Sequence, residues 1–136
     1  MIKIAFLQLL PSECVEENME KGIHYCKEAR KLGADIALFP EMWSCGYHIP
    51  HDLKKLNELA IPTDGEFVTC YAELAKELDM AIGITFLERR KSRPRNTICL
   101  YDHYGKSVYK YSKVHICNVI NHIFCFLCQL PSYYTG

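Results

Sequence analysis

The run Gly33-Ala34-Asp35-Ile36-Ala37-Leu38-Phe39-Pro40-Glu41 contains a helix terminator, a short apolar strand and a carboxylate in direct succession. Upstream, apolar residues recur at spacings of three and four over 15–29, which predicts an amphipathic helix with Gly33 as its C-terminal cap. The apolar residues 2–7 before it predict a strand buried on both faces. Strand, helix and strand form a βαβ unit with parallel strands. Ligands of such sheets bind at the carboxyl ends of the strands, which is where Glu41 lies.

The later part of the sequence predicts a second helix and a change of strand direction. Thr63-Asp64-Gly65-Glu66 has the pattern of a capping box, and an amphipathic stripe continues from it to residue 78. Residues 80–86 form a third apolar strand. Residues 97–101 and 106–111 are joined by a short connection with a late glycine, which predicts an antiparallel hairpin. The predicted class is therefore α/β, with a sheet that is parallel first and antiparallel later.

Composition excludes several classes of protein. The chain has 136 residues, of which 49% are hydrophobic, and its sixteen basic residues balance sixteen acidic ones. This balance gives no electrostatic basis for binding nucleic acid or an anionic membrane. The N-terminus lacks the features of a signal peptide, so the eight cysteines are predicted to be thiols in a reducing, cytoplasmic compartment. The most apolar stretch, 119–130, is too short and too polar to span a membrane.

Two polar residues could carry chemistry, although each also has an ordinary interpretation. Glu41 at a strand end could be a general base, with partial burial raising its pKa toward the working range, or it could simply cap a helix or face water. Lys113 follows the last strand and could equally be a surface lysine. The basic run 88–95 is interpreted as a solvated loop rather than a phosphate or nucleic-acid contact.

A zinc site can be drawn near the C-terminus, but its pattern is incomplete. Cys125 and Cys128 have CxxC spacing, with His115, Cys117 and His122 nearby. The usual second pair of ligands is missing at its usual distance, and the residues between the two cysteines are apolar. We therefore interpret these cysteines as small hydrophobic residues and predict no metal site.

Several short motifs together resemble the nitrilase superfamily of carbon–nitrogen hydrolases. Phe39-Pro40-Glu41 follows its strand, and Tyr111-Ser112-Lys113-Val114-His115 follows the strand that begins near Asn96-Thr97 and the turn at Gly105. The order and spacing of these motifs are specific, and the resemblance covers roughly residues 2–116. Further matching positions are Gln8, Asn18, Asp64-Gly65 and Gly83.

The resemblance implies a fold and a reaction. The family fold is a four-layer α-β-β-α sandwich, usually assembled into homo-oligomers, and this chain would supply its N-terminal portion. The family hydrolyses non-peptide carbon–nitrogen bonds of small amide, carbamoyl or nitrile compounds without a metal or organic cofactor. By this resemblance Glu41 is the general base that takes the proton of a nucleophilic cysteine, and Lys113 stabilises the oxyanion. The residues that would bind the substrate are not identified.

The resemblance ends before the nucleophile. In the family the cysteine lies well beyond the lysine, and Cys117, Cys125 and Cys128 are too near to it and lack its sequence context. Residues 114–136 also contain no acidic residue, whereas the family has a second glutamate after the lysine. We therefore predict a partial hydrolase domain over 1–117, a tail over 118–136 that does not follow the family, and a truncated, inactive chain. The alternative is a catalytically dead remnant or a binding fragment.

Overall fold

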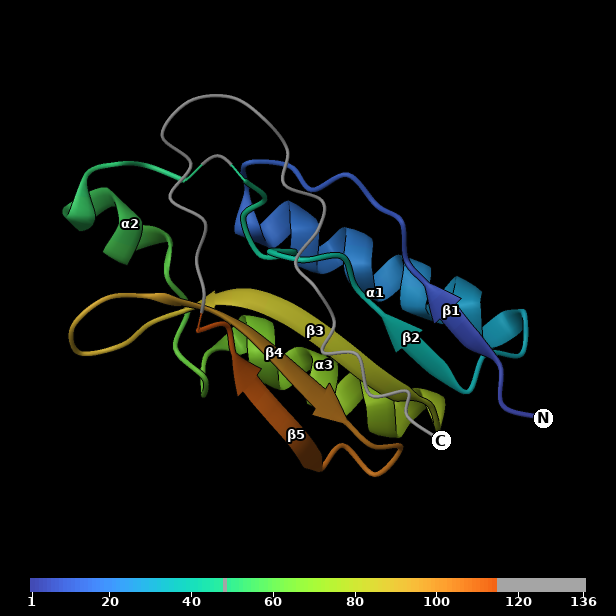
Figure 1. The fold of residues 1–136 in the computed structure, drawn as a ribbon. Helices are drawn as coiled ribbons and strands as arrows, with labels where there is room; N and C mark the ends of the chain where they lie inside the picture. Colours follow the sequence, from blue (N-terminus) through green and yellow to red (C-terminus); the bar gives the residue numbers. More distant parts are fainter. Residues whose placement is uncertain (48, 115–136) are drawn as a thin grey trace, which may run out of the picture.

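The computed structural model describes residues 1–47 and 49–114, and in this part of the chain all three helices lie before β3 in the sequence (Figure 1). The elements are β1 (Ile4–Phe6), α1 (Val15–Lys31), β2 (Ile36–Leu38), α2 (Leu53–Leu59), α3 (Glu66–Leu78), β3 (Ala81–Glu88), β4 (Arg95–Tyr101) and β5 (Ser107–Ser112).

The five strands form one mixed sheet in the order β1-β2-β3-β4-β5. The first three strands are parallel, with Ala5 opposite Ala37 and Ala37 opposite Ile82. β4 and β5 are antiparallel to their neighbours and form a hairpin whose turn contains Gly105 at a φ of 77°. The prediction of an α/β class with a parallel first half and an antiparallel second half is confirmed.

Both long helices cover the same face of the sheet (Figure 1). Alternate residues of the central strands point toward them, among them Ile82, Ile84 and Phe86, which are fully buried. Tyr71 of α3 lies at the centre of this layer. Its hydroxyl accepts a hydrogen bond from Trp43 Nε1 at 3.1 Å. The core therefore lies between the helices and the sheet. Through Trp43 it also holds the chain in place just beyond the end of β2.

Among the described residues, the two edge strands leave apolar side chains exposed on the other face of the sheet, and this corrects the prediction for the first strand. Residues 2–7 are predicted to be buried on both faces, but β1 is shorter, lies at the sheet edge, and leaves Ile4 and Phe6 49% and 68% exposed. Tyr109 and Tyr111 of β5 are also exposed. A continuous apolar run shows that both faces of a strand are apolar, but not that both are covered.

The predicted end of α1 is confirmed, whereas the predicted start of α3 is wrong. α1 has Glu16 and Glu17 in its first turn and is followed by Gly33 at a φ of 84°, as predicted for a left-handed cap. The capping box at 63–66 is wrong. α3 begins at Glu66 after the N-cap Gly65, and no side chain caps it, because Glu66 occupies the first helical position rather than the third.

Some predictions concern residues that the structure does not describe. The proposed boundary at 117/118, the tail over 118–136 and the incomplete zinc pattern all lie outside residues 1–47 and 49–114. Within those ranges no helix is both long and apolar enough to cross a membrane.

Candidate functional site

A tight elbow directly after β2 presents Glu41. Met42 has a φ of 58°, an unfavourable conformation for a side chain of its size. Thr85 of β3 fastens both sides of the elbow, because its hydroxyl accepts a hydrogen bond from the backbone N–H of Trp43 at 3.0 Å and donates one to the carbonyl oxygen of Pro40. The elbow is thus held rigidly against the central strand.

Two further side chains secure the segment after the elbow. The hydroxyl of Ser44 accepts a hydrogen bond from the backbone N–H of Leu87 at 3.1 Å. The amide of Asn18, buried on α1, donates to the carbonyl oxygen of Ser44 at 3.2 Å. Asn18, one of the positions that match the family pattern, therefore helps to hold the segment that carries Glu41.

Sheet topology brings Lys113 to the same place. β4 is antiparallel to β3, so it begins at the end of the sheet where β2 and β3 finish. β5 is antiparallel to β4 and finishes at that same end. The backbone N–H of Lys113 donates to the carbonyl oxygen of Asn96 at 2.8 Å, which continues the ladder one residue past β5. Residues 96 and 113 are therefore neighbours at the edge where Glu41 emerges.

Three side chains donate hydrogen bonds to the Glu41 carboxylate. Oε1 accepts from Lys113 Nζ at 2.9 Å and from Asn96 Nδ2 at 2.5 Å. Oε2 accepts from the hydroxyl of Tyr47 at 2.7 Å. The side chains of Glu41 and Lys113 are 41% and 31% exposed, so the pair is open to solvent on one side. The structure brings together the two residues that the sequence singled out.

The electrostatics of Glu41 differ from the prediction. Burial does raise the pKa of this carboxyl, but the hydrogen bonds from Lys113, Tyr47 and Asn96 and the charge of Lys113 outweigh it. The net effect lowers the pKa of Glu41 below its ordinary value of 4.5, so the group is an anion at neutral pH. Burial, together with the hydrogen bond to this anion, raises the pKa of Tyr47, which therefore remains a donor. The site therefore holds an ionised carboxylate, which is the form that a general base must have before it accepts a proton.

Four of the five described cysteines are poor nucleophiles. Burial raises the pKa of Cys26 and of Cys70 to about 12, and it also raises the pKa of Cys45 and Cys99. These thiols are protonated at neutral pH, whereas nucleophilic attack needs the thiolate. Cys14, the fifth, is the N-cap residue of α1, and its thiol donates a hydrogen bond to Glu16 in the first turn of that helix. The three cysteines after Lys113 lie outside the described residues.

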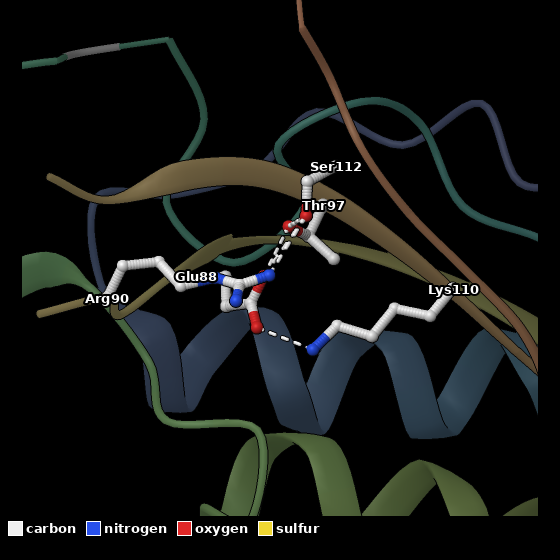
Figure 2. A network of polar contacts seen from close by, with 5 residues as sticks. All are labelled: Glu88, Arg90, Thr97, Lys110 and Ser112. Atoms are coloured by element: carbon white, nitrogen blue, oxygen red, sulfur yellow. Dashed lines mark hydrogen bonds and ion pairs between the residues drawn. The ribbon is translucent and has the colours of Figure 1, made fainter.

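A second polar cluster lies beside the site, where the sequence predicts a solvated loop. Glu88 is the last residue of β3, and its side chain is only 3% exposed. It contacts Lys110, Thr97, Ser112 and Arg90, as Figure 2 shows. The interpretation of 88–95 as a loop is wrong at both ends, because Glu88 belongs to β3 and Arg95 to β4. Within the described ranges, no group of three or more His, Cys, Asp and Glu side chains could hold a metal ion.

Sequence reasoning assigned no role at the site to three contributors: Thr85, Glu88 and Asn96. Asn96 could have been found, because it opens the strand that precedes Lys113 in the family-like pattern. Thr85 and Glu88 had no such signal, since a threonine in an apolar strand and an acid beside three basic residues are both ordinary.

Removing the Thr85 hydroxyl tests how the elbow is held. Thr85→Val keeps the shape of the side chain but leaves the N–H of Trp43 and the carbonyl of Pro40 without this partner. We expect the free energy of unfolding to fall by about 1–3 kcal/mol. Thr85→Ser keeps the hydroxyl and should lose less. Urea denaturation of the two variants checks this, and equal losses in both would show that packing of the methyl group, not the hydroxyl, is what matters.

Comparisons with known proteins identify the family of this chain. The family model described as carbon–nitrogen hydrolase matches residues 3–124. Among curated proteins, the chain is 32% identical over 116 residues to a citrullinase from Francisella tularensis, a match that covers 85% of this chain and 41% of that protein. It is 27% identical to an N-carbamoylputrescine amidase from Oryza sativa (85% and 38%) and 27% identical to an omega-amidase from Bos taurus (86% and 41%).

Solved structures share the fold. A carbon–nitrogen hydrolase from Helicobacter pylori superposes with a TM-score of 0.73 at 18% identity, covering 86% of this chain and 41% of that one. The NitFhit protein of C. elegans gives 0.72 at 22% identity, covering 85% and 29%. The chain thus spans about two fifths of the length of the curated relatives it matches. Because the family model matches most of its residues, this chain belongs to the carbon–nitrogen hydrolase family.

Proposed function

We propose that Glu41 and Lys113 are the general base and the oxyanion-stabilising cation of a site that hydrolyses a carbon–nitrogen bond in a small amide or carbamoyl compound. The observation that carries this proposal is the 2.9 Å contact between Lys113 Nζ and Glu41 Oε1, made across 72 positions of sequence. The names of the similar proteins, which include two amidases and a citrullinase, support an amide or carbamoyl substrate.

The reaction assigns a different task to each group. Glu41 takes the proton of a cysteine thiol, and the thiolate attacks the carbonyl carbon of the substrate. Negative charge develops on the carbonyl oxygen, and the ammonium group of Lys113 stabilises it. Ammonia or an amine leaves, and water then cleaves the thioester and restores the thiol. Asn96 and Tyr47 hold the carboxylate in one orientation by donating to its two oxygens.

The thiol is the group that this part of the chain does not provide. The buried cysteines are protonated, and Cys14 bonds to Glu16. We therefore expect residues 1–136 alone to release no ammonia from amides, carbamoyl compounds or nitriles. Iodoacetamide labelling followed by mass spectrometry should find no selectively reactive cysteine. Turnover that is lost when one of the eight cysteines is replaced would overturn this part of the proposal.

An added thiol can stand in for the nucleophile that the described residues do not provide. With 2-mercaptoethanol and p-nitrophenyl acetate, Glu41 would accept the thiol proton, a sulfur–carbon bond would form, and p-nitrophenolate would leave with acetyl-mercaptoethanol as the second product. We expect thiol-dependent p-nitrophenolate release above the uncatalysed rate. Each of Glu41→Gln and Lys113→Met should reduce it at least about tenfold.

The exposed lysine of the hairpin provides a matched control. Lys106→Met removes the same charge as Lys113→Met but lies away from the site, and it should leave the thiol-dependent rate unchanged. If folded protein shows no thiol-dependent release, or if Glu41→Gln and Lys113→Met release as much as the unaltered chain, the assigned roles are wrong. That result would favour the alternative of a binding fragment.

A further inference from the structure

A buried carboxylate cluster forms around Glu88 (Figure 2). Glu88 lies an even number of residues from Ile84 and Phe86 along β3, so its side chain points to the helix-facing side of the sheet. Glu88 Oε2 accepts the hydroxyl of Thr97 at 2.7 Å and that of Ser112 at 3.2 Å, and it pairs with Arg90 Nη2 at 2.9 Å. Its other oxygen, Oε1, accepts from Lys110 Nζ at 2.5 Å. One anion at the end of β3 therefore accepts hydrogen bonds from β4, from β5 and from the loop after β3, and it joins the three strands to one another.

The two hydroxyls of this cluster are chain neighbours of the residues that hold Glu41. Thr97 follows Asn96, and Ser112 precedes Lys113. Thr97 and Ser112 are also paired in the sheet, with their hydroxyl oxygens 2.8 Å apart. Because side chains alternate between the two faces of a strand, residues anchored on the helix-facing side leave their neighbours directed to the opposite side.

We infer that Glu88 is a positioning residue, which fixes the ends of β4 and β5 so that Asn96 and Lys113 both reach Oε1 of Glu41. The inference rests on the proposed function for the meaning of the Glu41–Lys113 pair. The charge is essential to it, because only an anion can satisfy two hydroxyls and two cations at one buried point. Thr97 is 1% exposed, so its hydroxyl has no solvent to replace this partner.

The pKa of Glu41 measures the positioning, because Asn96 and Lys113 help to keep it low. It can be followed in the whole chain by NMR titration of the Glu41 side-chain carboxyl carbon. Thr97→Val removes the hydroxyl without changing any charge, and we expect it to raise the pKa of Glu41. Thr97→Ser restores the hydroxyl and should return the pKa of Glu41 to that of the unaltered chain. Equal pKa values of Glu41 in all three proteins would overturn the inference.

Glu88→Gln gives a second test, in which the two possible roles of Glu88 predict opposite shifts in the pKa of Glu41. If Glu88 acted on Glu41 only through its charge, removing a nearby negative charge would lower the pKa of Glu41 further. If it positions Asn96 and Lys113, the pKa of Glu41 should rise instead. An unchanged or lower pKa would overturn the inference. Glu28, an exposed carboxylate on α1, is the internal reference, and its pKa should be the same in every variant.

These measurements separate the inference from the proposed function. The titration needs no turnover, so failure of the thiol assay with a raised Glu41 pKa in Thr97→Val would reject the chemistry and keep the positioning role. A working thiol assay with no change in the pKa of Glu41 would keep the chemistry and reject the positioning role. Loss of the folded amide spectrum in Glu88→Gln would leave the Thr97 pair of variants to decide, because those variants keep the carboxylate.

Discussion

Gly22→Ala is expected to lower the free energy of unfolding by about 2–3 kcal/mol, although alanine is normally the better helix former by about 1 kcal/mol. Gly22 lies inside α1 at its contact with α3. A β-carbon there would be 2.0 Å from the hydroxyl of Tyr71 and 2.9 Å from both Phe39 and Trp43. All three rings are buried, so one of them must move and the hydrogen bond between Trp43 and Tyr71 must stretch or break. Urea denaturation measures the loss.

A double-mutant cycle identifies the cause. Tyr71→Phe deletes the oxygen that the new methyl group would strike, so it should destabilise the Gly22→Ala protein less than it destabilises the unaltered chain. Glu20→Ala, on the exposed side of the same helix, should change the free energy of unfolding by no more than about 0.5 kcal/mol. Additive effects of Gly22→Ala and Tyr71→Phe would mean that the clash with the hydroxyl is not what destabilises the variant.

The sequence predicted the elements well because local rules decide them. The apolar period of α1, the left-handed cap at Gly33 and the turn at Gly105 each depend on a few adjacent residues. Which face of the sheet is covered depends instead on residues that are distant in the sequence. The exposure of Ile4 and Phe6 follows from both long helices packing on one face, which no local pattern in residues 2–7 can reveal.

The site shows the same division. Glu41 and Lys113 could be selected only because family-like motifs surround both of them, and the structure then placed them 2.9 Å apart. The direction of the Glu41 pKa shift could not be predicted, since it depends on donors from Tyr47 and Asn96 that reach it through an elbow and a strand pairing. Glu88 was hidden in a charged run, because its burial depends on β4 and β5 closing over it.

Glu88→Gln is expected to lower the free energy of unfolding at neutral pH by about 2–4 kcal/mol. Removing one partner from a buried ion pair costs about 3–5 kcal/mol, and the partial exposure of Lys110 and Arg90 reduces this, because water can solvate the cations that are left. The measurement is urea denaturation of both proteins at about pH 7 and at several lower values. Glu28→Gln, which breaks an exposed pair with Lys31, should change little at any pH.

The difference in the free energy of unfolding between the unaltered chain and Glu88→Gln should become smaller as the pH falls. Burial raises the pKa of Glu88, but its bonds to Lys110 and Thr97 and the charges of Lys110 and Arg90 outweigh this and lower the pKa below 4.5. The unfolded chain therefore binds more protons as the pH falls through that value, so the stabilisation by Glu88 is complete above it and is lost below it. The gap between the unaltered chain and Glu88→Gln should narrow as the solution becomes acidic. The pKa of Glu41 is lowered too, and Glu88→Gln is expected to raise it, so the stabilisation by Glu41 that the variant loses narrows the gap in the same direction as the pH falls. A gap that stays constant across the range would mean that the shape of the Glu88 side chain, and not its charge, holds the three strands together.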